Sequence, residues 1–150
     1  MTQATETKTA RTPLHLWVVG VLSLLWNAYG AYDYLMTQTG GDAYLRSMKM
    51  TETQIAYFHT MPTWTHGAWA IGVWGAIAGS VLLLLRREWA LHAFVASLAG
   101  LAASLVYTFL LSDGGELMGP QASVMHVAIT AACLVFVWYA WAMKKTGVLR

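Results

Sequence analysis

The sequence predicts an all-α fold, namely an integral membrane four-helix bundle with one or two short interfacial helices between the first and second spans. Three observations support this class. The 150-residue chain is 57% hydrophobic and only 11% charged, whereas in soluble domains about a quarter of the residues are charged. Its apolar residues form four runs, each long enough to cross about 30 Å of hydrocarbon as a helix. The runs do not alternate polar with apolar residues, which argues against β-strands.

The four spans form one transmembrane domain, residues 14–143, between the N-terminal tail 1–13 and the C-terminal tail 144–150. We expect the spans at about residues 14–36, 63–85, 89–111 and 121–143. A helix start tolerates proline, and the three prolines of the chain each stand just before a span: Pro13, Pro62 and Pro120. No proline therefore interrupts a span.

The connections between the spans differ in length. Residues 86–88 join spans two and three, which predicts a tight antiparallel hairpin, and the turn-rich SDGGELMGP joins spans three and four. The longer segment 37–62 contains TETQ at 51–54, a capping-box pattern followed by apolar residues at helical spacing. Asp42 fits the cap of an earlier turn. We expect one or two short helices here, lying on the membrane surface with their apolar side down.

Basic residues mark one end of the predicted bundle. Because cytoplasmic loops carry an excess of Lys and Arg, we expect a multi-pass protein of the bacterial inner (plasma) membrane with both termini in the cytoplasm. A cleavable signal peptide ending before Ala31 is the alternative, and it would leave three spans. The full length of the first apolar run favours an uncleaved span. Of the nine Lys and Arg residues, seven lie in the termini or the short hairpin: Lys8, Arg11, Arg86, Arg87, Lys144, Lys145 and Arg150.

Small residues recur every four positions along the second span, and the third span carries a similar stripe. Helices in a bilayer associate through small residues because these let the backbones approach closely. Since the short turn forces spans two and three together, we expect the stripes to form their shared interface. The alternative is a seam between two copies of the chain. The packing residues that we expect are Gly72, Gly75, Ala76, Gly79 and Gly100.

Polar side chains near the outer ends of the spans are candidate functional groups. By helical rise, Asp33 and His66 fall about 4 to 5 Å below the outer edge, and His126 about 7 to 8 Å, level with Tyr107. A carboxylate and two imidazoles could bind a divalent metal or form a proton-linked pocket for a small solute. The alternative is a hydrogen-bonded network near the headgroups. The two histidines lack the local spacing of a metal motif, so we expect no metal and no cofactor.

Asn27 is the deepest polar candidate, at about 13 Å from the outer edge. An amide at that depth has to hydrogen-bond inside the protein. It either joins helices by bonding to Trp74, Ser104 or Thr130, at about 0.6 to 2 kcal/mol per bond, or lines a solute path. Asn27 and Asp33 lie about 240° apart around the helix, so they do not share a face.

The sequence contains no arrangement typical of an enzyme or of a nucleic-acid-binding protein. It has no Ser–His–Asp set with supporting loops, no phosphate-binding glycine loop and no HEXXH motif. A single cysteine, Cys133, excludes an internal disulfide and a multi-cysteine metal site. We therefore expect no enzyme and no nucleic-acid partner, and the lipid bilayer as the surroundings of the protein.

Two stretches carry a family resemblance, RTPLHLWVVGVLSLLWNAYGAYDYLMTQT and AWAIGVWGAIAGSVLLLLR. They resemble a group of short four-span inner-membrane proteins of alphaproteobacteria, some of which are labelled "sugar transporter". The resemblance implies a four-span fold and favours a transporter, but it transfers no catalytic or binding residue. Two function classes stay open. One is a small transporter or carrier of an unidentified small solute, working as a homo-oligomer; the other is a non-transport accessory or structural subunit of a larger membrane complex.

Overall fold

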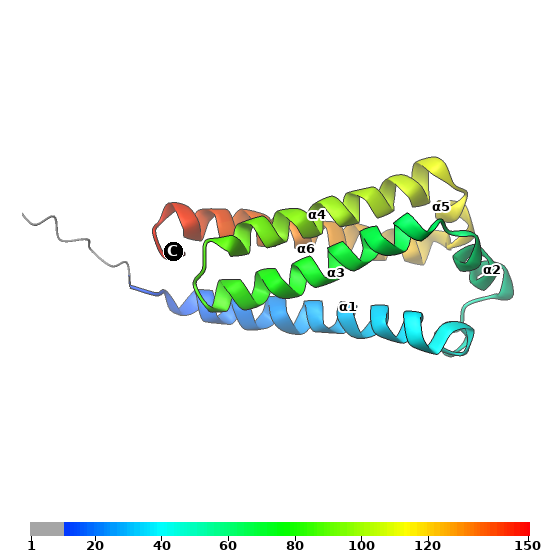
Figure 1. Cartoon of the computed structure of the whole chain (residues 1–150), viewed down its shortest axis with the longest axis horizontal. Coiled ribbons are helices and arrows are strands. Elements are labelled where there is room, and N and C mark those ends of the chain that lie inside the picture. Colours follow the sequence, from blue (N-terminus) through cyan, green and yellow to red (C-terminus); the bar gives the residue numbers. More distant parts are fainter. Residues whose placement is uncertain (1–10) are drawn as a thin grey trace, which may run out of the picture.

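The computed structural model describes residues 11–150, and every regular element within that range is a helix. Four long helices run along the molecule, and two short ones lie at one end of it, opposite the C-terminus (Figure 1). In chain order the helices are α1 (Leu14–Ser47), α2 (Glu52–Thr60), α3 (Thr63–Leu84), α4 (Trp89–Val106), the π-helical turn η1 (Tyr107–Leu111), α5 (Gly114–Leu117) and α6 (Gly119–Lys145).

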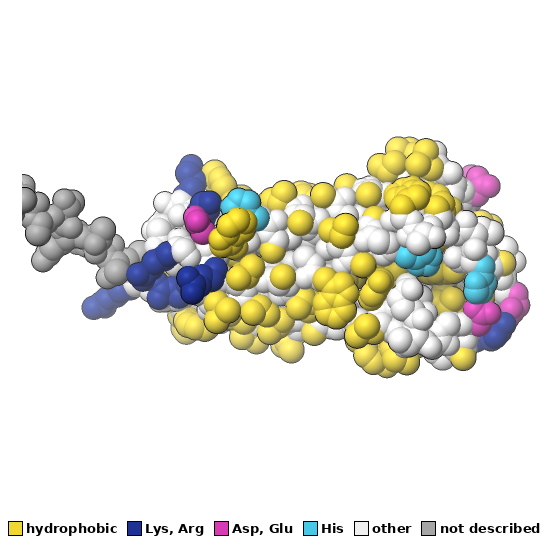
Figure 2. Space-filling model, in the orientation of Figure 1, with side chains coloured by type: hydrophobic (Ala, Val, Ile, Leu, Met, Phe, Trp, Pro, Cys, Tyr) yellow, Lys and Arg dark blue, Asp and Glu magenta, His cyan; other side chains and the backbone are white. Residues whose placement is uncertain are grey.

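Four of these helices are long and apolar enough to cross a membrane, namely α1, α3, α4 continued by η1, and α6. This confirms the predicted all-α class and the four apolar segments. Hydrophobic side chains cover the visible flank of the molecule, and charged side chains gather at its two ends (Figure 2). The arrangement is that expected of a multi-pass membrane protein.

Helix α1 is longer than the apolar run that predicts it. It has 34 residues and contains a kink at Gly41, where φ is 51° and ψ is −139°, a conformation that suits glycine. The helix continues past residue 36 because threonines and glutamine do not stop helical hydrogen bonding. We had expected Asp42 to cap a separate short helix. It does not, because its carboxylate faces His59 and Arg46 instead.

Contacts between α1 and α3 determine how far the two helices are shifted along each other. Asn27 meets Ser80, Tyr34 meets Trp69, and Gln38 meets His66. If this antiparallel register continues, Thr63, the first residue of α3, lies level with the kink of α1 at Gly41. The level that we took as the outer end of the first span, near residue 36, therefore lies inside the bundle. The apolar run ends at residue 36, whereas the polar end of α1 still packs beside α3.

Helix α2 is the predicted short helix between the first two spans. The Thr51 hydroxyl accepts from the Gln54 backbone N–H at 3.3 Å, and the Gln54 side chain accepts from the Thr51 N–H at 3.0 Å, so the capping box is confirmed. Ile55 and Tyr57 are buried on its inner side. The Tyr57 hydroxyl lies 2.8 Å from Ser112 Oγ, which joins α2 to the segment between η1 and α5. The helix thus covers one end of the bundle.

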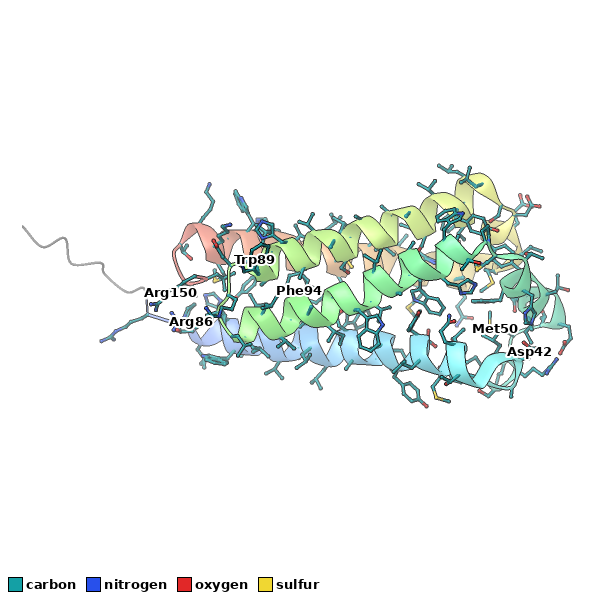
Figure 3. The ribbon with its side chains drawn as sticks, viewed as in Figure 1. Asp42, Met50, Arg86, Trp89, Phe94 and Arg150 are labelled. Atoms are coloured by element: carbon teal, nitrogen blue, oxygen red, sulfur yellow. The ribbon has the colours of Figure 1, made fainter. Side chains whose placement is uncertain are left out.

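The long helices pack in the order α1, α3, α4 and α6, with the α3–α4 hairpin at the centre. A hydrophobic core lies at the end of the molecule that carries the C-terminus. There the last three residues fold back onto the α3–α4 turn: the Arg150 N–H donates to the Arg86 carbonyl at 2.8 Å, and the Glu88 N–H donates to the Arg150 carbonyl at 3.1 Å (Figure 3). The core residues are Leu16, Leu83, Ala90, Phe94, Tyr139, Ala140, Val148 and Leu149.

Candidate functional site

Asn27 lies in the contact between α1 and α3 and is only 9% exposed. Its amide nitrogen donates to the Ala76 carbonyl at 3.3 Å and to Ser80 Oγ at 3.0 Å. The Ser80 hydroxyl in turn donates to the same Ala76 carbonyl at 2.9 Å. These bonds close a small polar triangle between the two helices, and they satisfy both amide hydrogens of the side chain.

The partners that we expected for Asn27 were wrong. Ser104 donates to the Gly100 carbonyl, and Thr130 donates to the His126 carbonyl, each within its own helix. Helical Ser and Thr often bond in this way to the carbonyl four residues earlier. The small-residue stripe of α3, which includes Ser80, was the signal that could have identified the true partner.

Both Asn27 and Asp33 lie well inside the part of α1 that packs beside α3. Measured from the level of the α3 start, Asp33 is about 12 Å inside and Asn27 about 21 Å inside, by helical rise. The Asp33 carboxylate still finds a partner, because the Tyr44 hydroxyl donates to its Oδ1 at 2.8 Å. Tyr44 reaches back to it from beyond the kink at Gly41, so the kink supplies the partner for this half-buried acid.

The two histidines each have a separate environment. His66 Nδ1 lies 3.3 Å from the amide nitrogen of Gln38 on α1. His126 bonds through Nδ1 to the Ala122 carbonyl at 2.8 Å, and its ring meets the edge of Phe109 with the ring centroids 5.7 Å apart. The structure therefore does not bring Asp33, His66 and His126 together. Across residues 11–150, no group of three His, Cys, Asp or Glu side chains could hold a metal ion.

Tyr107 begins η1, the π-helical turn that ends the third span. Its ring packs edge-on against Trp64, with the ring centroids 5.6 Å apart. The turn widens the end of the helix and buries Thr108, while the Ser112 hydroxyl donates to the Tyr107 carbonyl at 2.9 Å. This arrangement joins the start of α3 to the end of α4 through aromatic packing, and Tyr107 has no described hydrogen bond to the other polar candidates.

The predicted packing residues lie between α3 and α4 or beside α1. A Cβ on Gly100 would lie 2.5 Å from the Ala68 carbonyl oxygen, and Gly72 and Gly75 likewise face backbone atoms of α4. Gly79 instead accommodates the ring of Phe94, and Ala76 supplies the carbonyl that Asn27 bonds. The Ser97 hydroxyl also donates to the Gly72 carbonyl across this contact. The close approach of the hairpin helices thus depends on the absence of side chains at these positions.

An ionic network at the α2 end was missed by the sequence analysis. Arg46 donates to both carboxylate oxygens of Glu52, from Nε at 2.9 Å and from Nη2 at 3.1 Å. His59 Nε2 lies 2.8 Å from Asp42 Oδ1, and Asp42 also faces Arg46. The hydrogen bonds from Arg46, followed by its positive charge, lower the pKa of Glu52. Asp42 and Arg46 are four residues apart, a spacing that could have indicated the pair.

Two surface hollows stand out among the described residues. One is a groove between α4 and α6, and the other lies beside η1 and α5. Neither is lined by Asn27, Asp33, His66 or His126. The candidate polar groups therefore lie in helix contacts rather than in these hollows.

Comparison with known proteins identifies no relative: no family model, no curated protein and no solved structure matches the chain. The function has to be argued from the geometry of the chain itself. Its deep polar side chains are paired one by one, across helices or within them. Of these, the Asn27 pair joins two helices, and the Asp33 and His126 pairs lie within α1 and α6.

Proposed function

We propose that this protein is a non-catalytic accessory subunit of the inner membrane, which packs against a larger membrane complex and has both termini in the cytoplasm. The observation that carries the proposal is the position of α6. Only 6% of its most apolar stretch is buried within the chain, against 22 to 28% for the other three long helices. A helix with so little of its surface buried within the chain leaves most of that surface for contacts outside the chain.

One side of α6 offers a suitable face for a partner helix. Val124 and Val127 are each 70% exposed, Val135 is 54% exposed, and Ala131 lies on the same side of the helix. Alanine and β-branched valine lose little side-chain entropy on packing. Because lipid is as apolar as these residues, association there depends on close fit between the helices. The occupant that we propose is an apolar transmembrane helix of another protein.

Purification of the tagged protein in a mild detergent tests this proposal. We expect a stoichiometric complex with a second membrane protein, identified by mass spectrometry of the purified fraction. Ala131→Trp should reduce the recovery of that protein at least several-fold. Ala102→Trp, a substitution of an exposed alanine on α4, is the matched control and should leave recovery unchanged. A monomer, a homo-oligomer, or equal loss in both variants would contradict the accessory function.

Transport of a small solute is the alternative that the family resemblance favours. A carrier needs a polar path to its deep groups. The Asn27 amide hydrogens are both bonded to α3, and the two hollows lie elsewhere, so the geometry supports this alternative less well. Solute uptake by proteoliposomes that is lost in Asn27→Leu, with the fold intact, would reverse this preference.

A further inference from the structure

A groove of ≈ 750 Å³ runs between α4 and α6 on the surface of the molecule. Its α4 side extends over residues 91–99, a length of about 12 Å along the helix. The small side chains of Ala96 and Ala99 leave space beside the larger residues of α6. Eight of the nine lining residues are apolar, and the ninth is a histidine: Leu91, His92, Val95, Ala96, Ala99, Leu134, Val137, Trp138 and Trp141.

One end of this groove opens at the basic end of the molecule. His92 lines it beside the first turn of α4, and its ring lies 5.0 Å from that of the exposed Trp89. On the α6 side, Lys145 Nζ lies 4.4 Å from the ring centroid of Trp141, another lining residue. A cation is thus held over the wall of the groove.

The charges around this opening are mostly positive. Lys144 pairs with Glu88 at 3.3 Å, whereas Lys145 has no ion pair among residues 11–150. The α3–α4 turn and the C-terminal segment add Arg86, Arg87 and Arg150 to the same end (Figures 2 and 3). An anion placed at the opening would therefore meet an excess of positive charge. The remainder of the groove offers only apolar contacts.

We propose that this groove binds one anionic phospholipid, taken from the membrane leaflet at the basic end. One of its acyl chains lies against Ala96 and Ala99, and its phosphate lies at Lys145 and His92. Basic pockets between membrane helices at a membrane surface suit acidic headgroups. Tryptophans such as Trp89 and Trp141 are typical of the headgroup level, which sets the phosphate at the right depth. The α6 side of the site runs from Leu134 to Trp141, mostly beyond the partner face, so the site does not rest on the proposed function.

Native mass spectrometry of the full chain tests the site. The protein is purified in a mild detergent containing equal amounts of phosphatidylglycerol and phosphatidylcholine. We expect one phosphatidylglycerol to be retained in preference to phosphatidylcholine. Lys145→Gln should reduce this preference about fivefold, because one basic residue near a headgroup contributes about that factor. Ala96→Phe should fill the groove and remove the bound lipid, and Ala99→Phe repeats the test if the first variant unfolds.

Two controls separate this site from general attraction to charge. Lys49→Gln removes a cation from the other end of the molecule and should leave lipid retention unchanged. Glycerol phosphate, which has the headgroup chemistry without an acyl chain, should not displace the lipid. Equal retention of the two lipids, equal effects of Lys145→Gln and Lys49→Gln, or displacement by glycerol phosphate would overturn the proposal.

Discussion

Asn27 joins two membrane helices through one side chain. The Ala76 carbonyl and the Ser80 hydroxyl of α3 accept hydrogen bonds from its amide, and they take the place of the water that a polar group would otherwise need. The depth of the residue makes these bonds necessary, and the neighbouring small residues make them possible. A single substitution at this position should therefore change the stability of the α1–α3 contact without changing its shape.

Asn27→Leu keeps the approximate size of the side chain and removes both hydrogen bonds. We expect the free energy of unfolding in mixed micelles to fall by about 1 to 2 kcal/mol. Thr130→Val is the control, because the Thr130 hydroxyl bonds only within its own helix, and its effect should be much smaller. Equal losses in the two variants would show that Asn27 does not join the helices.

Arg46 controls the charge of Glu52 at the exposed α2 end. Because the pKa of Glu52 is lowered from its ordinary value of 4.5, the ion pair stabilises the fold above that value, and its contribution is lost as pH falls through the lowered pKa. Arg46→Gln should raise the pKa of Glu52, as measured by carboxyl NMR titration. Lys49→Gln should leave it unchanged. A pKa that does not move in Arg46→Gln would exclude the described pair in solution.

Among the elements, the α3–α4 hairpin has the tightest contact. A methyl group on Gly100 would lie 2.5 Å from the Ala68 oxygen and 2.7 Å from the Gly72 nitrogen, and these are backbone atoms that cannot rotate away. Gly100→Ala should therefore lower the free energy of unfolding by about 1 to 3 kcal/mol. Gly67→Ala has nothing within 4 Å of the new methyl group and should be neutral or stabilising by up to about 1 kcal/mol. Unfolding in mixed micelles compares the two, and a similar cost for both would argue against the close contact.

The sequence predicted the features that depend on local chemistry. The capping box at Thr51 and the short turn before α4 follow from neighbouring residues, and both appear in the structure. The shift of α1 along α3 depends on contacts between distant residues, which no local pattern contains. For that reason Ser80 was not recognised as the partner of Asn27, nor Tyr44 as the partner of Asp33.

At the scale of the whole molecule, the separation of charge along the bundle leads to a prediction of its orientation. The basic end carries the C-terminus and the start of α1 (Figure 1), and Lys49 follows α1 at the α2 end. In a Cys133→Ser background, Lys49→Cys should react with a membrane-impermeant maleimide on intact spheroplasts. Thr146→Cys should react only after the membrane is opened. The reverse labelling pattern would show that the orientation is opposite to the one predicted. Labelling of both cysteines from outside would show that the two ends of the bundle do not lie on opposite sides of the membrane.

The folded-back C-terminal segment bears on the order of events during biogenesis. Residues 148–150 follow α6, so the α3–α4 turn can be bonded to Arg150 only after all four long helices have been synthesised. Until then the apolar core at that end lacks Val148 and Leu149, which are each only 4% exposed once in place. That core therefore stays open until residues 148–150 have been added, and it closes when they fold back onto the α3–α4 turn.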